Sequence, residues 1–419
     1  MKSTTSTEIT RLDLQDLSTP SSASITNVKQ LSSYNWIEAP TPTIAVPGCP
    51  PLWSTPKLSS RLRKDSGLIY IAQNAARHPE SPLEPLFRSL YITNPSFEIC
   101  SIDVVTDRNN IRKILCFINP KLSRNAPEAF TIKIEITKNT ALFSRQETAT
   151  SEYIESHQFR GYGHEFEKAN TTSQIRDSTG HHRIISYHFG GLEFVVRYET
   201  DAYVGATADT TNPSNGEEQG NEDLSKMLGS LCLSSSSSVP DITPAESRLT
   251  IKEEGKVVPL DTTLEIKTRV SHKPLPLEEI IPQLWVSQTP KLVRAYHSKG
   301  LFREPKVEDM TADIKKWEEG NQKDLTKLAA LMGRILSLVK GYGGNAILKY
   351  DEQGDKLIIS KTDRKAMLPK CLYSKWESKD NPEVVAEGSR TPVEKVETKE
   401  GKIIENEGEY VGPGPDQKS

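Results

Sequence analysis

The sequence predicts an α+β domain in which a mixed β-sheet is flanked by helices, and three patterns support this prediction. Residues 130–144 alternate apolar and polar side chains around a polar turn, which is typical of a β-hairpin. Residues 195–201 and 263–268 are rich in β-branched and aromatic residues, which favour strands. Apolar residues recur at helical spacing within 308–340, so we expect a covering helix or helix pair there.

Length and composition are compatible with a single folded domain. A chain of 419 residues could hold two or three domains by length, but 35% hydrophobic and 26% charged residues supply a core only if part of the chain stays unfolded. We therefore expect one domain over residues 31–375. The segments expected to be disordered are rich in Ser, Thr or charged residues: an N-terminal tail (1–30), an insertion (about 207–246) and a C-terminal tail (376–419).

Charge and cysteine usage exclude several classes of protein. A net charge of -3 argues against a globally basic nucleic-acid binder, so any polyanion would be held in a local groove or through metal ions. The five cysteines show no C-x-x-C spacing, which argues against a disulfide framework and a structural zinc site. No signal peptide is evident, and the most apolar run, 328–339, is interrupted by Gly333 and Arg334. We expect an intracellular protein, nuclear or cytoplasmic, with no membrane contact.

The remaining segments complete the predicted order of elements. Aromatic and turn residues between 34 and 53 suggest an irregular segment lying over the domain. Residues 77–90 are predicted to be helical in part, and 97–105 to form a strand. A short helix and a strand are expected within 282–296, followed by a closing hairpin over 346–360.

Two pairs of charged residues stand out on the predicted strands. Glu199 and Asp201 are two residues apart, as are Glu265 and Lys267, so each pair shares one face of its strand. If the two strands pair, three carboxylates and one ammonium share a surface, and Asp201 and Glu265 would be close enough to hold one divalent cation. The alternative is that both pairs are the ordinary solvated face of an amphipathic strand.

Two further segments carry candidate functional residues. Arg108 lies at a bend between two apolar runs, where it would either contact a phosphate or make an ordinary salt bridge. Gly161 and Gly163 lead into a predicted helix that carries Glu165 and Glu167. The helix dipole alone would also favour acids at this position.

In their order along the chain, these segments resemble the DXO-type RNA decapping nucleases. Residues 97–117 are similar to the stretch in which that family has an Arg before a Thr-Lys-Ile-Leu run, and Arg108 would take the place of that Arg. Residues 163–167 are similar to its Gly-Φ-x-Φ-Glu motif, 199–201 to Glu-Φ-Asp and 265–267 to Glu-Φ-Lys. Each triplet alone is common, so the specificity of the resemblance, which spans roughly residues 34 to 300, comes from the order.

The resemblance implies a restriction-endonuclease-like core and a hydrolase that uses two divalent ions, Mg²⁺ or Mn²⁺. Its substrate would be the 5′ end of RNA, from which it would remove incomplete or NAD-type caps, with or without 5′→3′ exoribonuclease activity. By position in the motifs, the metal ligands would be Glu167, Asp201, Glu265 and the backbone carbonyl of Ile266. Glu199 would reach the ion through water, and Lys267 would polarise the attacking water. Arg108 and Gln283 would contact the substrate.

The sequence departs from the family pattern at four positions. His164 and Thr200 replace hydrophobic residues, and Asp107 and Asn109 replace the Trp and Gly that flank the family's Arg. These changes bear on cap specificity more than on metal binding. Two other classes stay open: a restriction-like nuclease acting on DNA or structured RNA, and a non-catalytic module that binds RNA or stabilises a partner 5′→3′ exoribonuclease. The intact acids and Lys267 argue against the second.

Overall fold

The strands form three sheets within the residues that the computed structural model describes, which are 5–55, 61–123, 128–205, 246–363 and 365–377. The largest is a mixed sheet of eleven strands, in which β6 runs parallel to both of its neighbours. Its order is β1 (Ser6–Thr10), β20 (Lys356–Lys361), β19 (Asn345–Asp351), β7 (Phe130–Thr137), β8 (Thr140–Gln146), β6 (Val104–Asp107), β12 (Leu192–Glu199), β11 (Ser178–Phe189), β2 (Thr26–Ile37), β3 (Thr43–Gly48) and β14 (Thr250–Gly255).

A second sheet of seven strands and a separate two-stranded ribbon complete the described sheets. The second sheet contains β10 (Thr171–Thr172), β4 (Leu52–Trp53), β13 (Ala202–Tyr203), β15 (Thr263–Val270), β16 (Lys291–Ser298), β17 (Leu301–Phe302) and β18 (Val307–Asp309). The ribbon, which we call the β5–β9 ribbon, pairs β5 (Gly67–Tyr70) with β9 (Ser151–Ile154).

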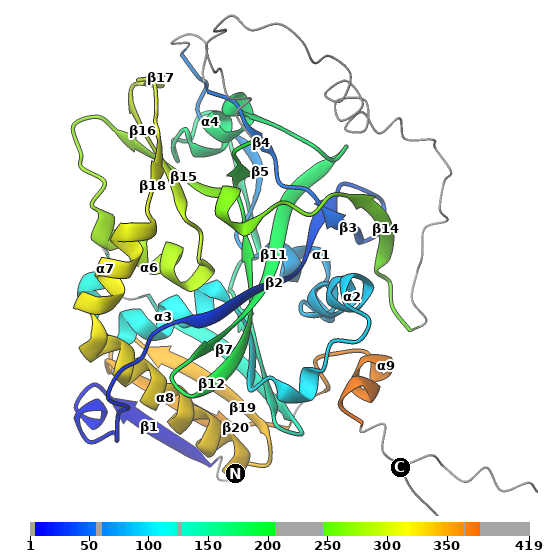
Figure 1. The fold of residues 1–419 in the computed structure, drawn as a ribbon, viewed down its shortest axis with the longest axis vertical. Helices are drawn as coiled ribbons and strands as arrows, with labels where there is room; N and C mark the ends of the chain where they lie inside the picture. Colours follow the sequence, from blue (N-terminus) through cyan, green and yellow to red (C-terminus); the bar gives the residue numbers. More distant parts are fainter. Residues whose placement is uncertain (1–4, 56–60, 124–127, 206–245, 364, 378–419) are drawn as a thin grey trace, which may run out of the picture. The chain divides into compact units, whose positions relative to one another are not determined.

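Helices pack on both faces of the large sheet (Figure 1). One face is covered by α3 (Arg108–Ile118), α6 (Leu277–Ser287), α7 (Thr311–Gly320) and α8 (Gln322–Gly341). The other is covered by α2 (Glu84–Thr93) and α9 (Lys370–Tyr373). The remaining described α-helices are α1 (Gln73–Arg77) and α4 (Gly163–Asn170), and short 3-10 turns occupy Asp13–Gln15, Ile99–Ser101, Pro120–Leu122, Leu260–Thr262 and Ser374–Trp376.

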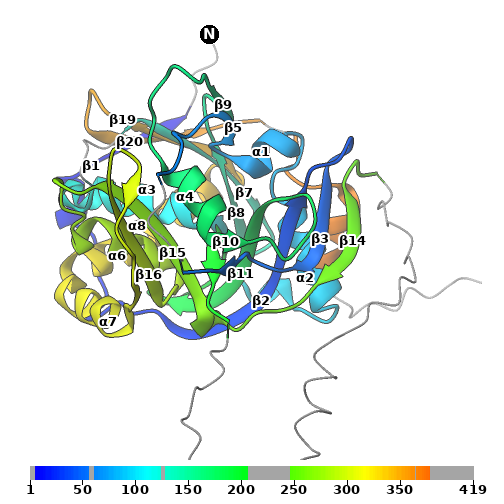
Figure 2. The same ribbon diagram turned by 90° about the horizontal axis from the view of Figure 1, so that it is seen from above.

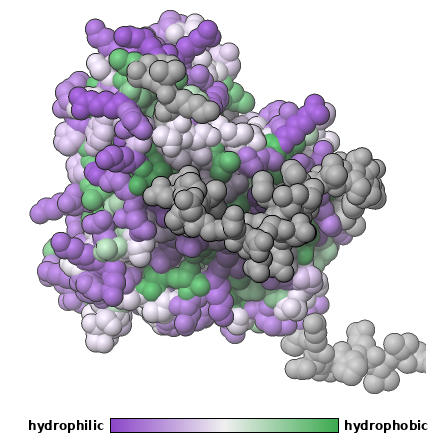
Figure 3. Space-filling view, turned by 45° about the horizontal axis from the view of Figure 1, so that its top comes forward, coloured by the Kyte–Doolittle hydropathy of each residue, from purple (hydrophilic) through white to green (hydrophobic). Residues whose placement is uncertain are grey.

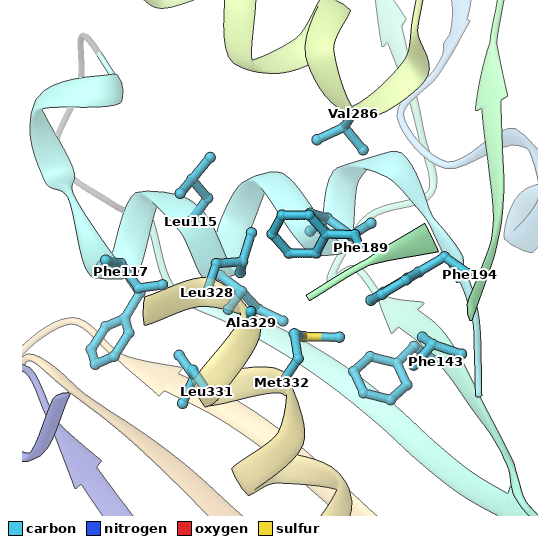
Figure 4. Packing of buried hydrophobic residues seen from close by; sticks show 14 of the residues in the cluster. Leu115, Phe117, Phe143, Phe189, Phe194, Val286, Leu328, Ala329, Leu331 and Met332 are labelled. Carbon is cyan, nitrogen blue, oxygen red and sulfur yellow. The ribbon is translucent and has the colours of Figure 1, made fainter. Parts of the chain in front are cut away.

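The core lies on both faces of the large sheet because its central strands are apolar on both sides. On β12, Phe194 and Val196 pack toward α3 and α8, whereas Val195 packs toward α2. Figure 4 shows the first of these two layers, in which side chains of α3, α8 and the central strands interdigitate: Leu115, Phe117, Phe143, Phe189, Phe194, Leu328, Ala329, Leu331 and Met332. This doubly covered sheet carries Glu199 at the end of β12, and Arg108 follows the end of β6.

The fold class predicted from the sequence is confirmed. The expected hairpin within 130–144 is formed by β7 and β8, and the expected hairpin within 346–360 by β19 and β20. The helical stripe within 308–340 is the α7–α8 pair. The strand predicted over 263–268 is β15. These elements have strong periodic patterns, which is why the sequence identifies them.

Three expectations about the chain before residue 108 were wrong. Residues within the expected tail 1–30 are ordered: β1 pairs with β20, and β2 begins at Thr26. β1 is an edge strand that buries Ile9 among polar residues, so it carries little apolar signal. The segment 34–53, expected to be irregular, contains part of β2 and all of β3, and the strand expected over 97–105 is a 3-10 turn followed by β6.

The polar residues of β2 explain why that strand was missed. Ser33 and Asn35 are buried on either side of Tyr34, and their side chains donate to the Pro47 and Cys49 carbonyl oxygens. These bonds satisfy polar groups that would otherwise interrupt a buried strand. The expected insertion at about 207–246, apart from its last residue, and the C-terminal tail beyond residue 377 lie outside the described residues.

The exposed surface of the described residues is mainly polar on the face drawn in Figure 3. Figure 3 shows one face on which polar residues dominate and hydrophobic residues form separate patches. In the part of the chain that the structure describes, none of the helices combines the length and the apolar character needed to cross a bilayer.

Candidate active site

Arg108 and Glu199 lie at the same edge of the large sheet because β6 and β12 are parallel neighbours. Asp107 is paired in register with Arg197, so the residues that follow, Arg108 and then Glu199, emerge on one side. Arg108 is the first residue of α3, not part of a simple bend as predicted. The first turn of this helix is fixed by the buried Asn110, which donates to Thr106 Oγ1 (3.1 Å) and to the backbone of β8.

The chain then crosses from the large sheet to the second sheet, and this crossing brings the next acids together. β13 pairs antiparallel with β15, with Ala202 opposite Leu264, which sets Asp201 beside Glu265. The Ile266 N–H donates to Asp201 Oδ2 at 2.7 Å. The two longer strands do not pair directly, which was the condition for one shared surface, because β12 and β15 belong to different sheets and the short β13 makes the connection.

Glu265 is the centre of the charged cluster. It is buried, and its Oε1 accepts hydrogen bonds from Lys267 Nζ and Gln283 Nε2, while its Oε2 accepts one from Arg108 Nη1 at 3.1 Å. Burial alone would raise the pKa of Glu265, but the charges of Lys267 and Arg108 and their hydrogen bonds outweigh it and lower the pKa to about 2. Glu265 is therefore ionised at any physiological pH.

Each donor to Glu265 comes from a different element. Lys267 lies two residues along β15, on the same face as Glu265. Gln283 is presented by α6, the helix that leads into β16, which runs parallel to β15. Burial alone would lower the pKa of Lys267, but the charges of Glu265 and Asp201 raise it above its ordinary value. The side chain is thus a stable ammonium and not a base.

Arg108 is held by three contacts. Besides Glu265, its Nη1 donates to Ser287 Oγ at 3.4 Å, and its guanidinium carbon lies 5.6 Å from the centre of the Tyr198 ring. Ser287 is the last residue of α6 and Tyr198 precedes Glu199 on β12. The orientation of Arg108 therefore depends on both sheets and on α6.

Glu167 reaches the cluster from α4. Its neighbour Phe166 is fully buried against Trp53 and Phe302 of the second sheet. The start of α4 is capped from a distance: Asp65 accepts hydrogen bonds from the Gly163 N–H (2.9 Å) and the Glu165 N–H (3.0 Å). These two anchors fix the helix that carries Glu167.

The cluster holds more negative charge than its cations neutralise. Burial and the charge of Glu265 raise the pKa of Asp201 to about 7. Burial and the charge of Asp201 raise the pKa of Glu167 well above its ordinary value. Partial desolvation also raises the pKa of Glu199 against the opposing charge of Arg108, although this side chain is open to solvent. Lys267 and Arg108 both bond Glu265. Glu167, Asp201 and Glu199 therefore lack a full counter-charge.

This donor set fits a hard divalent cation, which prefers carboxylate and carbonyl oxygens. The raised pKa values of Glu167 and Asp201 are the sign of such a fit, because a cation would favour their ionised forms. Among the described residues, no group of three or more His, Cys, Asp or Glu side chains is already drawn into a compact cluster suited to a metal. In the described part of the chain the acids therefore do not form a ready-made coordination shell.

A cavity of about 130 Å³ opens beside Arg108 and Glu199. Its wall includes the fully buried Arg197, which donates to both carboxylate oxygens of Asp107 (2.7 and 3.1 Å). The Asp at position 107, a departure from the family pattern, thus neutralises a buried guanidinium. Arg145 of β8 also lines this cavity.

His182 contributes a neutral group to the same wall. Its Nε2–H donates to Gln73 Oε1 at 3.1 Å, and its ring stacks on Tyr34 with centroids 5.1 Å apart. Burial and the charges of Arg197 and Arg145 lower the pKa of His182 well below its ordinary value. The cavity wall is therefore a fixed polar network in which the imidazole is uncharged.

The sequence did not single out several residues that shape the site. Asp65 lies in a loop almost a hundred residues before the helix it caps, and Arg145 follows the alternating pattern of an ordinary hairpin. His182 lies in the middle of the long strand β11. Neither spacing nor composition distinguishes these three positions, because their roles depend on contacts between distant segments.

The fold is shared with solved structures of Rai1 from three yeasts. Rai1 from S. pombe in complex with 3′-FADP superposes with a TM-score of 0.53 at 15% identity, over 86% of this chain and 100% of that one. Candida albicans Rai1 in complex with pU5-Mn²⁺ gives 0.52 at 12%, over 89% and 99%. Scheffersomyces stipitis Rai1 in complex with (3′-NADP)⁺ and calcium gives 0.54 at 11%, over 90% and 99%. The resemblance to the DXO-type enzymes is thereby confirmed in the fold.

Residues 8–370 match the family described as "Domain of unknown function (DUF8563)", and the chain belongs to this family. The match covers the whole of the charged cluster. No curated protein matches the sequence.

Proposed function

We propose that this protein is a divalent-metal-dependent hydrolase that acts on the 5′ end of RNA. The observation that carries the proposal is the cluster around Lys267, in which Glu167 and Asp201, whose pKa values are raised, and the ionised Glu265 lie beside an ammonium that stays protonated. A fold shared with Rai1 structures that contain pU5 and Mn²⁺, or a dinucleotide and calcium, supports RNA ends as the substrate class.

In this proposal Glu167, Asp201, Glu265 and the backbone carbonyl of Ile266 would hold Mg²⁺ or Mn²⁺, and Glu199 would reach an ion through water. Two such ions would neutralise charge on the phosphate under attack and activate a water molecule. Lys267 would stabilise negative charge that develops during attack, because its raised pKa keeps it cationic.

Arg108 and Gln283 would orient the substrate. Arg108 lines the cavity and lies next to the acids, so a phosphate at the mouth of the cavity would meet its guanidinium. The leaving group would then lie inside the cavity, against the network of Arg197, Asp107 and the uncharged His182. We propose incomplete and NAD-type caps as the groups removed, with or without subsequent 5′→3′ degradation.

A panel of RNA oligonucleotides that share one sequence and differ only at the 5′ end tests this proposal. The ends are triphosphate, monophosphate, unmethylated cap, methylated cap and NAD, and single-stranded and duplex DNA of the same sequence are included. We expect Mn²⁺-dependent release of the 5′ group from the incomplete and NAD-type caps, measured by mass spectrometry, and none in the presence of EDTA.

The Lys267→Met variant is the matched control, because it should fold and bind metal but hydrolyse slowly. Cleavage at internal sites of duplex DNA would instead identify a restriction-like nuclease. RNA binding without hydrolysis under any metal would identify a non-catalytic module, including one that stabilises an exoribonuclease.

A further inference from the structure

The β5–β9 ribbon exposes a row of apolar and aromatic side chains. Leu68 and Tyr153 lie directly opposite each other, so both point to one face of the ribbon, and they are 56% and 63% exposed. Tyr70 follows on the same face, with the Arg77 guanidinium 4.9 Å from its ring centre. A two-stranded ribbon with an uncovered aromatic face is unusual, because such residues are normally buried.

A second exposed ring lies in the loop after β9. Phe159 is 59% exposed, and its ring packs edge-on against Tyr162 with centroids 5.6 Å apart. Lys64 Nζ lies 5.6 Å above the same ring. The loop is tied back to the ribbon by the ion pair between Arg160 and Glu152 at 2.5 Å. The ring is therefore held in place and is not a side chain on a free tail.

The segment that leads into β5 is strongly basic. Arg61, Arg63 and Lys64 occur within four residues, and all three are exposed. Within the described part of the chain, none of the three has an acidic partner at ion-pair distance. These charges are available to a polyanion, whereas the net charge of the whole protein is -3.

The ribbon spans the candidate active site along one side. β5 begins two residues after Asp65, which caps the helix carrying Glu167, and it ends just before Ile71, which lines the cavity with Arg108. Ile71 is 43% exposed. Figure 2, read with Figure 1, shows β5 between α4 and α1. The ribbon therefore ends at the wall of the cavity.

We propose that the β5–β9 ribbon is a binding platform for single-stranded nucleic acid, on which nucleotides near the 5′ end stack on Tyr153 and Phe159 while Arg61, Arg63 and Lys64 contact their phosphates. Aromatic rings interleaved with cations bind single strands of any sequence, because every base has a π-face and every nucleotide a phosphate. The inference rests on the proposed function only for the choice of RNA over DNA.

The test is fluorescence anisotropy of the full-length protein with a labelled 5′-phosphorylated oligouridylate of about 12 nucleotides, in EDTA so that binding is separate from hydrolysis. We expect Tyr153→Ala and Phe159→Ala each to weaken binding about tenfold, and Tyr153→Phe to bind like the wild type. Lys64→Glu should weaken binding and lower its dependence on salt. Leu12→Ala is the matched control, because Leu12 is 73% exposed on the turn after β1.

A capped dinucleotide separates this inference from the proposed function, because it has no further nucleotides to stack on Tyr153 and Phe159. We expect the Tyr153 and Phe159 variants to hydrolyse a capped dinucleotide at the wild-type rate and to lose efficiency only on the longer RNA. Loss of oligonucleotide binding in a protein that hydrolyses nothing would refute the proposed function and support the platform. Unchanged binding by folded Tyr153→Ala, Phe159→Ala and Lys64→Glu would refute the platform. If these variants instead differed from the wild type in self-association, measured by sedimentation, the ribbon would be assigned to contact with a second copy of the chain.

Discussion

Arg108 donates to the carboxylate of Glu265, with Nη1 3.1 Å from Oε2. The proposed metal would require the same carboxylate. This ion pair joins the edge of the large sheet to the second sheet. Both Glu265 oxygens already accept hydrogen bonds, since Lys267 and Gln283 bond Oε1. A cation that binds Glu265 must therefore compete with Arg108, the residue proposed to hold a phosphate.

Replacing Arg108 by Met should consequently tighten metal binding while it weakens substrate binding. Removal of a competing cation should lower the Kd for Mn²⁺ about tenfold, measured by isothermal titration calorimetry. The KM for a 5′-capped RNA should rise, because the phosphate loses its guanidinium. Weaker Mn²⁺ binding in a folded Arg108→Met protein would contradict the competition.

The variants Glu265→Gln and Lys267→Met should separate metal binding from turnover. Glu265→Gln keeps the shape of the side chain but removes the charge that the cation needs, so calorimetry should show loss of Mn²⁺ affinity. Lys267→Met should bind Mn²⁺ nearly as the wild type does and lose about 100- to 1000-fold in kcat at saturating metal. Wild-type rates in both folded variants would show that Glu265 and Lys267 are only the ordinary solvated face of β15.

The metal-free protein should be destabilised by its own acids. The pKa of Asp201 rises from 3.8 to about 7 on folding, so the folded state binds this proton more tightly than the unfolded state does. Stability should therefore fall as the pH rises from about 4 to about 7. In EDTA at about pH 8, Asp201→Asn should raise the Tm by a few degrees, with no gain at about pH 4. Added Mn²⁺ should raise the Tm of the wild type and not of the variant. Equal Tm values for the two proteins across this pH range would contradict the crowding of charge.

Asp65→Ala should destabilise the protein and displace Glu167 through α4. The change removes the acceptor for two backbone N–H groups at the start of the helix, which costs about 1 to 2 kcal/mol in the free energy of unfolding. Mn²⁺ affinity should fall as well, although Asp65 is not a proposed ligand. Asp261→Ala, which removes an exposed acid that caps no helix, is the control and should change neither quantity. Unaltered metal affinity in Asp65→Ala would show that α4 keeps its place without the cap.

The sequence predicted the charged residues better than it predicted the strands that hold them. Glu265 and Lys267 share a face because the period of a strand is two residues, which requires no knowledge of the fold. The position of Asp201 beside Glu265 depends instead on the two-residue strand β13, which is too short to have a pattern. The sequence therefore predicted that these acids meet if the two longer strands pair, whereas the short β13 makes the pairing.

The supporting residues lay beyond sequence reasoning for a physical reason. Asp65 and Arg145 act on groups far away in the chain, and their local sequence is that of an ordinary loop and an ordinary strand. Sequence patterns also fail to predict polar strands such as β2. Its Asn35 can be buried because Cys49 and Ser178 accept hydrogen bonds from the side-chain amide. Such positions become visible only when the tertiary hydrogen bonds are known.

The crossing between the two sheets is only two residues long, and this has a consequence for how the family can vary. β12 ends at Glu199 and β13 begins at Ala202, so Thr200 and Asp201 alone span the sheets. One inserted or deleted residue would turn Asp201 to the opposite face and away from Glu265. We therefore expect homologues to differ freely in length beyond β13 but never between Glu199 and Ala202. The spacing of these two positions is a length signature by which relatives that keep the acidic cluster can be recognised.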